Sequence, residues 1–243
     1  LTRPASHFTQ PSMPDEQSAN AGYWCVCGAL CVGSPVRDPL RMKWTTAVGH
    51  VRRLAEQCAE MSLLPPDTRS LHVTELWVFG DLLGAPRELD WGSAAVCVDL
   101  PAREVPWMCR PDGATSWAEA TRASKNPVGI WWRSSRSPVW NHRIVRPLLV
   151  WDVADGIHEE NLAAIREGRG GAVAVAAPSE GEYVTRLNQE LQNSLAELQR
   201  RTQEYEVEHT TRLGVRGDRL HAAAAGFLDV WVAVHPEEVG DDG

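Results

Sequence analysis

The sequence predicts an α+β fold, in which a small mixed sheet with flanking helices is followed by a helical C-terminal part. Two runs rich in β-forming residues, 72–79 and 94–100, are separated by a glycine-containing turn. A third apolar run occupies 147–156. After residue 156, apolar side chains recur at helical spacing, so the sheet is expected to end there and helices to follow.

The same pattern divides the chain into three regions. Residues 1–41 are polar, rich in Pro and Ser at their start and without periodicity, so we expect a disordered extension, either a tag or upstream sequence. Helical periodicity begins after Met42, which we expect to start the folded unit. An α/β domain then covers 42–156 and a helical domain covers 157–243.

Cysteines in the first region raise the question of a metal site. Cys25, Cys27 and Cys31 are spaced C-x-C-x3-C, which is not a common zinc pattern, and a fourth ligand near them is found only in His7 or the distant His50. We therefore expect no metal there. Cys58 and Cys97 lie in apolar patterns and are expected in the core.

The elements of the α/β region follow from local signals. Residues 45–62 place apolar side chains on one helix face, and Thr45 or Thr46 can cap this helix. The strand at 94–100 ends at Pro101, which cannot donate to a ladder. A helix is expected within 115–126, before Pro127.

Three helices are expected in the C-terminal region, at 157–168, 179–209 and about 218–235. Ser179 and Glu182 form a capping box for the longest one, and Asp218 can cap the last. The long helix is either an oligomer seam or, as we favour, packed against its neighbours. Its apolar stripe comprises Tyr183, Leu187, Leu191, Leu195, Leu198, Thr202 and Tyr205.

Composition limits the function classes. The chain has 243 residues and a formal net charge of −8, which argues against a wholly basic nucleic-acid binder. Charge is uneven, because eight Arg and Lys face three acidic residues between 101 and 150. No apolar stretch is long enough to span a bilayer and no signal-peptide pattern is present, so we expect a cytoplasmic protein without membrane contact.

The stretch 78–91, VFGDLLGAPRELDW, resembles the start of nucleotidyltransferase-fold proteins, in which a strand, a Gly-Ser turn, a further Gly and an Asp-x-Asp pair follow one another. The resemblance covers roughly 45–100. It implies a ligand-binding turn at Gly80, Asp81 and Gly84, although Asp81 stands where the family has Ser. Segments such as MKWTTAVGHV and RPLLVWDVADG also resemble an uncharacterised bacterial family of high-GC genomes, which implies a shape and no established activity.

The metal carboxylates of that family are displaced here. They are expected near 92 and 94, where this chain has Gly92 and Ala94. Nucleotidyl transfer needs Mg2+ held by hard oxygen ligands, and two acids two residues apart on a strand share one face. The remaining candidates for catalysis are Asp90, Asp99 and Asp152, each near a strand end. Each also has a purely structural interpretation. Asp90 fits a turn, Asp99 lies shortly before Pro101, and Asp152 can cap the helix near 157.

The segment 107–151 interleaves six tryptophans with arginines. Arginine forks bind phosphate and indoles stack on bases, so a nucleotide or RNA is a possible ligand. The favoured alternative is that the indoles pack between the two domains and the arginines lie over them. The candidate ligand-binding residues are Arg133, Arg136, Asn141, His142 and Arg143.

Three functions are compatible with these patterns. The first is a protein with a degenerate nucleotidyltransferase-like domain that binds a nucleotide, an RNA or a protein partner without two-metal chemistry and without a cofactor. The second is an active nucleotidyltransferase that uses Mg2+ at a displaced carboxylate set. The third is an interaction module of a toxin–antitoxin-type pair, using the acidic helix 179–209, through which an oligomer could also form.

Overall fold

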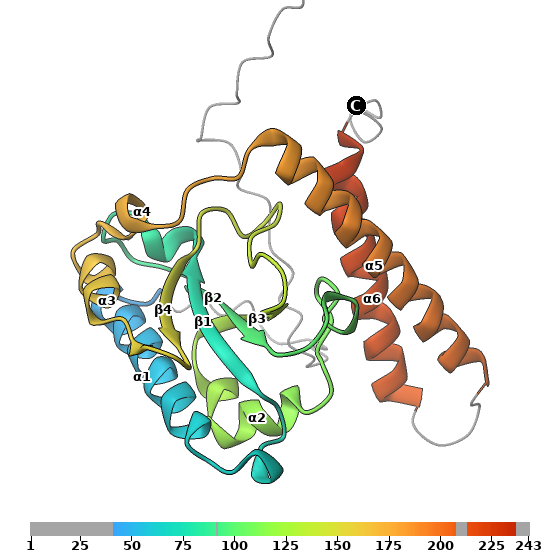
Figure 1. The fold of residues 1–243 in the computed structure, drawn as a ribbon, viewed down its shortest axis with the longest axis horizontal. Coiled ribbons are helices and arrows are strands. Elements are labelled where there is room, and N and C mark those ends of the chain that lie inside the picture. The colour runs from blue at the N-terminus through green and yellow to red at the C-terminus, as the bar shows by residue number, and fades with distance from the viewer. Residues whose placement is uncertain (1–40, 91, 208–212, 237–243) are drawn as a thin grey trace, which may run out of the picture. The chain divides into compact units, whose positions relative to one another are not determined.

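The computed structural model describes residues 41–90, 92–207 and 213–236. Within them a five-stranded mixed sheet has the order β3-β2-β1-β4-β5 (Figure 1). This confirms the α+β prediction with a helical C-terminal part. The strands are β1 (Val73–Phe79), β2 (Gly92–Val98), β3 (Val128–Ser134), β4 (Leu148–Asp152) and β5 (Gly156–Ile157).

The central strand β1 pairs antiparallel with both β2 and β4, and β2 pairs parallel with β3. The turn between β1 and β2 begins at Gly80, whose φ of 68° lies in the left-handed region that suits glycine. Strand β3 was not among the predicted strands. Its sequence, VGIWWRS, has three consecutive bulky apolar residues and a single charged one, so it lacks the alternation of apolar and polar side chains that indicates a half-buried strand.

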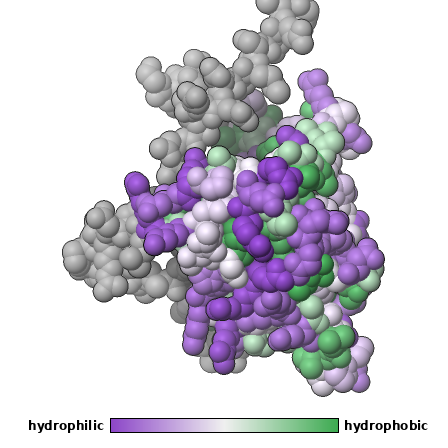
Figure 2. All heavy atoms as spheres, turned by 90° about the vertical axis from the view of Figure 1, so that its left-hand side faces the viewer, coloured by the Kyte–Doolittle hydropathy of each residue, from purple (hydrophilic) through white to green (hydrophobic). Residues whose placement is uncertain are grey.

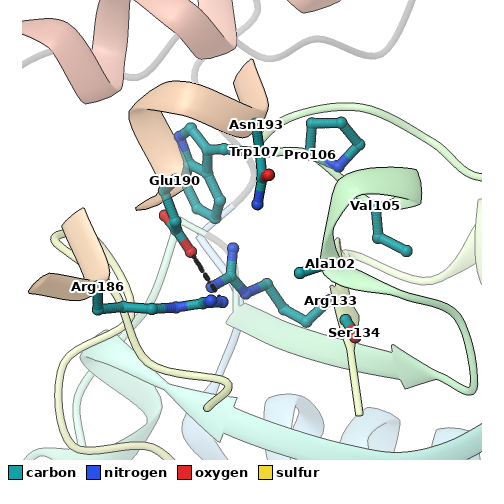
Figure 3. A pocket seen from close by; sticks show the side chains of 9 residues that line it. All are labelled: Ala102, Val105, Pro106, Trp107, Arg133, Ser134, Arg186, Glu190 and Asn193. Atoms are coloured by element: carbon teal, nitrogen blue, oxygen red, sulfur yellow. Dashed lines mark hydrogen bonds and ion pairs between the residues drawn. The ribbon is translucent and has the colours of Figure 1, made fainter. Parts of the chain in front are cut away.

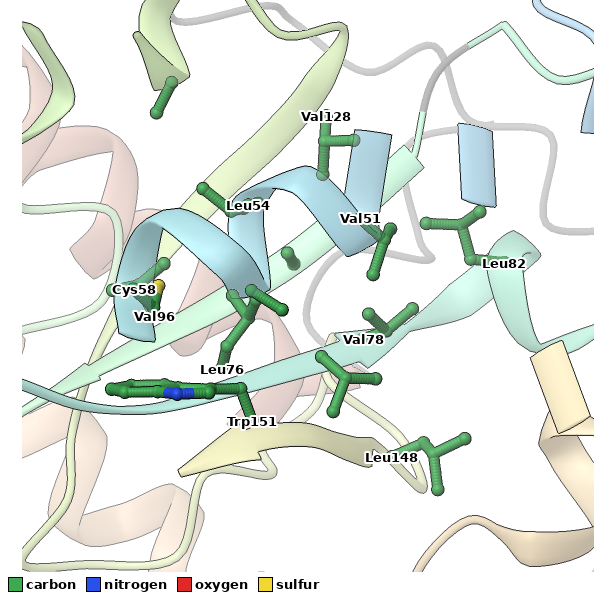
Figure 4. Close-up of a cluster of buried hydrophobic side chains, with 14 of the residues drawn as sticks. Val51, Leu54, Cys58, Leu76, Val78, Leu82, Val96, Val128, Leu148 and Trp151 are labelled. Atoms are coloured by element: carbon green, nitrogen blue, oxygen red, sulfur yellow. The ribbon is translucent and has the colours of Figure 1, made fainter. Parts of the chain in front are cut away.

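One face of the sheet carries the main core, covered by α1 (Trp44–Ser62), α2 (Ala114–Ala120) and α3 (Glu159–Arg166). Figure 4 shows side chains of α1 interdigitating with those of β1, β2 and β4. The predicted inner face of α1 is confirmed, because Val48, Val51, Leu54 and Cys58 are all buried. Burial of such aliphatic side chains contributes about 1.5–3 kcal/mol each, which makes this core the main source of stability.

The opposite face of the sheet is covered by a hairpin of two long helices, α5 (Glu180–Val207) and α6 (Leu213–Val234) (Figure 1). A second hydrophobic cluster joins hairpin and sheet; it contains Phe79, Ala95, Cys97, Trp107, Val139, Ile144, Leu187 and Val230. The sheet is therefore enclosed between helices on both faces. A short helix, α4 (Gly170–Val173), lies in the small-residue connection before the hairpin.

The capping box of the long helix is confirmed. The backbone N–H of Ser179 donates to the Glu182 carboxylate at 2.9 Å, and the N–H of Glu182 donates to the Ser179 hydroxyl at 3.4 Å. The predicted cap of the last helix is wrong, because α6 already begins at Leu213 and Asp218 lies inside it.

The predicted apolar stripe of the long helix is only partly its buried face. Leu187 is buried, but Leu195 and Tyr205 are exposed. The other buried positions of α5 are polar: Arg186, Glu190, Ser194 and Glu197. Arg186 and Glu190 contact polar groups on the sheet side, as described below, whereas Glu197 is paired with Arg200 and Arg201 of α5 itself.

Several expectations fall outside the described residues. The extension 1–40, with Cys25, Cys27 and Cys31, is among them. Where the cysteines are described, Cys58 and Cys97 are buried as expected, and Cys109 is buried as well. Among the described helices, none has both the length and the apolar character needed to cross a membrane.

Candidate functional site

A buried polar cluster lies where the hairpin meets the end of β3. Arg133 donates from Nη2 to Oε1 of Glu190 on α5, and from Nε to the carbonyl oxygen of Val139 at 3.0 Å. Arg186, one turn earlier on α5, lies 3.2 Å from the same Glu190 oxygen. Figure 3 shows both guanidinium groups converging beside that carboxylate. All three side chains are at least nine-tenths buried, so this is an internal ion cluster.

Asn141 completes the coordination of Glu190 and shapes the loop before β4. Its Nδ2 donates to Oε2 of Glu190 at 3.1 Å. Its Oδ1 accepts the backbone N–H groups of Arg143 and Ile144 at 2.9 and 2.8 Å. Every polar atom of this amide thus has a partner, which fixes the loop against the hairpin.

A second cluster surrounds Asp229 on α6. Nε2 of His142 and Nε1 of Trp107 each lie 2.8 Å from its Oδ2, and Arg143 donates to both carboxylate oxygens. Burial raises the pKa of Asp229, but hydrogen bonds from His142, Arg143 and Trp107 outweigh it and hold that pKa far below the usual range. The carboxylate is therefore charged in the folded protein.

The tryptophans of the 107–151 segment pack mainly with each other and with the core. Trp107 stacks on Trp131 with ring centroids 4.8 Å apart, and Arg133 lies over the Trp107 ring at 5.6 Å. Trp117 meets Trp132 edge to face. Trp107, Trp117, Trp132 and Trp151 are buried. These indole faces are thus occupied by protein groups, as in the packing alternative.

The structure does not bring the three candidate catalytic aspartates together. Asp90 precedes β2 and Asp99 follows it, so the seven-residue strand separates them by about 23 Å. Asp99 and Asp152 flank β1 on opposite sides, because β2 and β4 are its two neighbours. Two strand spacings, about 10 Å, therefore lie between them at least.

Asp99 and Asp152 each have partners of their own. Arg136 donates to Asp99 at 2.8 Å, and this hydrogen bond lowers the pKa of the exposed Asp99 carboxyl. Asp152 accepts the N–H groups of Ala154 and Asp155 and contacts His158 at 2.7 Å. Among the residues that the structure describes, no group of three His, Cys, Asp or Glu side chains is placed to hold a metal ion.

The turn that carries the family resemblance lies apart from the polar clusters of the hairpin. Asp81 is exposed and forms an ion pair with Arg87. The N–H of Gly84 donates to the carbonyl oxygen of Asp81 at 3.2 Å, which closes the 3-10 turn Gly80–Leu83. Gly80 and Gly84 thus shape a turn in which the Asp81 carboxylate is already paired.

Two cavities border these elements. One of about 10 Å³ lies at the ion cluster, and room of that size suits about one water molecule. The other, of about 140 Å³, lies between α1 and α3 and is lined by Thr45, Val48, Gly49, Arg52, Leu162 and Arg166. Figure 2 shows the side of the molecule where α1 and α3 lie, with hydrophobic residues visible between hydrophilic ones. Neither volume reaches the ~300 Å³ typical of small-molecule sites.

Sequence patterns do not predict three residues of the polar clusters: Arg186, Glu190 and Asp229. Arg186 and Glu190 are four residues apart on α5, and buried Ser194 and Glu197 continue the same face. Polar residues that recur at helical spacing normally indicate a solvated face. Two features of the sequence nevertheless point to burial of this polar row. It lies beside an apolar row on the same helix, and the basic segment 101–150 requires acidic partners from elsewhere in the chain.

Comparison with protein families gives one match. A family model described as a domain of unknown function, DUF7711, matches residues 42–236. The comparisons with curated proteins and with solved structures found no match. The matched range starts at Met42, where the helical periodicity begins, and includes the whole sheet and both hairpin helices.

Proposed function

We propose that this chain, which belongs to the family of unknown function DUF7711, is a protein-interaction module that acts by binding rather than by metal-dependent catalysis. Its recognition surface is the outer side of the α5–α6 hairpin, and the partner that fits this surface is a second copy of the chain. The observation that supports the proposal most is the distribution of charge on the hairpin.

Charged side chains in the middle of the hairpin all point inward. Between Tyr183 and Gln199 the charged residues are Arg186, Glu190 and Glu197, and all three are buried. Between Ala222 and His235 the single Asp or Glu is Asp229, which is held by His142, Arg143 and Trp107. The outer side of these stretches is therefore uncharged, as is typical of the centre of a protein interface.

Large apolar side chains are exposed on the same outer side. Leu228 and Val232, one turn apart on α6, are 57% and 41% exposed. Val184 and Leu195, three turns apart on α5, are 50% and 41% exposed. Leu228 and Val232 are neighbours on one face of α6, whereas on α5 the exposed, uncharged residues Asn188 and Gln192 lie between Val184 and Leu195. The outer side is therefore an uncharged patch with some apolar side chains on each helix.

A second copy of the chain is the occupant that this patch favours. An uncharged surface meets no like-charge repulsion when it faces itself, so a twofold interface between two hairpins is allowed and would make a four-helix arrangement. The uncharged stretch 222–235, nearly all of it in α6, has a length of about 21 Å. Two helices that are together about 20 Å wide then offer an uncharged area of about 420 Å² per partner, roughly half of the ~800 Å² of a standard interface, so we expect a weak dimer.

The other functions have less support from the described residues. A nucleotidyltransferase-like origin for 45–100 is supported by the order helix, strand, glycine turn, strand, and we retain it as part of the proposal. Catalysis is less favoured, because Asp90, Asp99 and Asp152 lie at separate places. Nucleotide or RNA binding at 107–151 is less favoured, because Arg133 is buried against Glu190 and most indoles are packed.

Sedimentation velocity over a range of micromolar concentrations tests the proposal. We expect a dimer whose population rises with protein concentration. The substitution Leu228→Glu should raise the dimer dissociation constant by at least about tenfold, because a charge would enter an apolar interface. Leu195→Glu should act in the same direction.

The matched control is Val153→Glu. Val153 is 52% exposed, similar to Leu228, but it follows β4 and is not part of the hairpin. The substitution Val153→Glu should leave the dimer dissociation constant unchanged. A wild-type chain that stays monomeric across this range, or a dimer that Val153→Glu weakens as much as Leu228→Glu, would rule out the proposed surface.

A further inference from the structure

We propose that the cavity at the hairpin–sheet junction is a binding site for one small monovalent anion of the size of chloride, held by Arg186 and Arg133. The cavity lies on the inner side of α5, between Trp107, Ser134, Asn193 and the ion cluster (Figure 3). It is separate from the outer surface proposed for self-association, so the two proposals stand or fall independently.

The charges around the cavity do not cancel. Of the nine residues that line it, Arg133 and Arg186 are positive and Glu190 alone is negative. The other side chains are neutral: Ala102, Val105, Pro106, Trp107, Ser134 and Asn193. One positive charge is therefore left over in a place with low solvent access, and a monovalent anion would balance it.

Arg186 also has a hydrogen-bond donor to offer. Its Nη2 donates to the Ser137 hydroxyl and to the carbonyl oxygen of Pro138, both at 3.2 Å. Its Nε is buried and has no acceptor among the residues that the structure describes. The side chain is 7% exposed, so bulk water does not satisfy this group fully. An unpaired N–H on a buried cation is costly, so an acceptor bound at Nε would stabilise the folded protein.

The electrostatic environment of Arg186 also favours an anion beside it. Burial lowers the pKa of its guanidinium, Glu190 opposes that change, and the charge of Arg133 lowers the pKa further. Two guanidinium groups share one carboxylate, and a second negative charge would relieve their repulsion.

The size of the cavity selects the ligand. A volume of about 10 Å³ accommodates a single atom-sized occupant and not a phosphate or a nucleotide. A neutral water molecule could accept from Nε but would leave the charge unbalanced. A halide supplies both the acceptor and the charge, with only slight outward movement of the lining side chains.

Thermal unfolding of the full chain in sodium chloride, compared with sodium gluconate at equal ionic strength, is the first test. We expect a saturable rise of the midpoint with chloride, because a ligand that binds only the folded state stabilises it. Line broadening of the 35Cl NMR signal upon addition of protein gives a direct readout. Identical unfolding midpoints in the two salts, with no broadening, would overturn the proposal.

Two variants assign the effect to the cavity. Glu190→Gln removes the competing carboxylate and should tighten chloride binding by about tenfold or more, whereas Arg186→Gln should weaken it by at least as much. Arg200→Gln, on the exposed side of the same helix, should leave chloride binding unchanged. Equal chloride responses in all three variants would place the ion elsewhere and overturn the assignment. If a variant does not fold, a bromide anomalous signal in wild-type crystals decides: a peak beside Arg186 Nε supports the site, and a water there overturns it.

Discussion

Arg133 on β3 and Glu190 on α5 form an ion pair in which both side chains are at least 95% buried. The two residues are 57 positions apart in the chain. A buried pair of this kind gives little net stability compared with apolar groups, but it is costly to break, because one charge is then left buried alone. The contact therefore fixes how the hairpin is placed on the sheet.

Loss of the Glu190 carboxylate should destabilise the protein strongly. Glu190→Ala would leave Arg133 and Arg186 buried side by side, and we expect a loss of about 3–5 kcal/mol in the free energy of unfolding, measured by denaturant titration. The control is Asp81→Ala, which breaks the exposed pair with Arg87 and should cost at most about 1 kcal/mol. If both variants lost the same free energy of unfolding, the buried ion cluster would contribute no more to stability than an exposed ion pair.

Acid should weaken the contact between α6 and the loop before β4. The pKa of Asp229 is lowered in the folded state, so the folded protein binds this proton more weakly than the unfolded chain does. The stabilisation that the charged Asp229 carboxylate provides is fully present above the ordinary aspartate pKa of 3.8. It is lost as the pH falls below that pKa towards the lower pKa of the folded state. Asp229→Asn should cost about 1.5–3 kcal/mol at neutral pH. The difference between wild type and variant should shrink below pH ~4; a constant difference down to pH ~2 would contradict this linkage.

Close packing of α6 on the segment before α2 depends on a glycine. A Cβ added at Gly226 would lie 2.2 Å from the carbonyl oxygen of Trp107. Gly226→Ala should therefore push the helix outward and cost about 1–3 kcal/mol. On the same helix, a Cβ at Gly217 meets nothing within 4 Å, so Gly217→Ala should stabilise by about 0.5–1 kcal/mol. Thermal unfolding of both variants should show shifts of opposite sign, and a stabilised Gly226→Ala would contradict the contact.

Three cysteine thiols should be protected from alkylation. Cys58, Cys97 and Cys109 are buried, and burial raises the pKa of the Cys109 thiol to about 12. Because the thiolate is the reactive form, iodoacetamide should label these three positions only upon unfolding. Peptide mapping by mass spectrometry after native and denatured labelling measures this directly. Labelling of Cys97 in the native protein would indicate that the hairpin opens.

A thermal-unfolding screen with nucleotides tests whether the protein binds them in a Mg2+-dependent way, as a nucleotidyltransferase would. With Asp90, Asp99 and Asp152 apart, we expect nucleoside triphosphates to give no shift in unfolding temperature that requires Mg2+. A saturable, Mg2+-dependent shift that Asp99→Asn removes would favour the nucleotidyltransferase alternative instead.

Local signals in the sequence were sufficient for much of the fold. The periodicity of 45–62 indicated the buried face of α1, and Ser179 with Glu182 indicated the start of α5. The start of α6 could not be predicted in the same way. Asp218 is a good cap residue, but the helix extends past it to Leu213, since a capping residue permits a helix start without requiring one.

The sequence by itself determined the α+β class, the main strands around the glycine turn and the absence of an Asp-x-Asp pair after Gly80, because these depend on short-range spacing. Only the tertiary structure decided which side of α5 is buried. Hydrophobic periodicity shows which face of a helix is most apolar, but the face that becomes buried depends on the groups it packs against. Here α5 packs against the polar side chains of Arg133 and Asn141. Those groups come from 57 and 49 residues away. A buried charge is tolerated only where such a distant counter-charge meets it, and that meeting is a property of the folded chain.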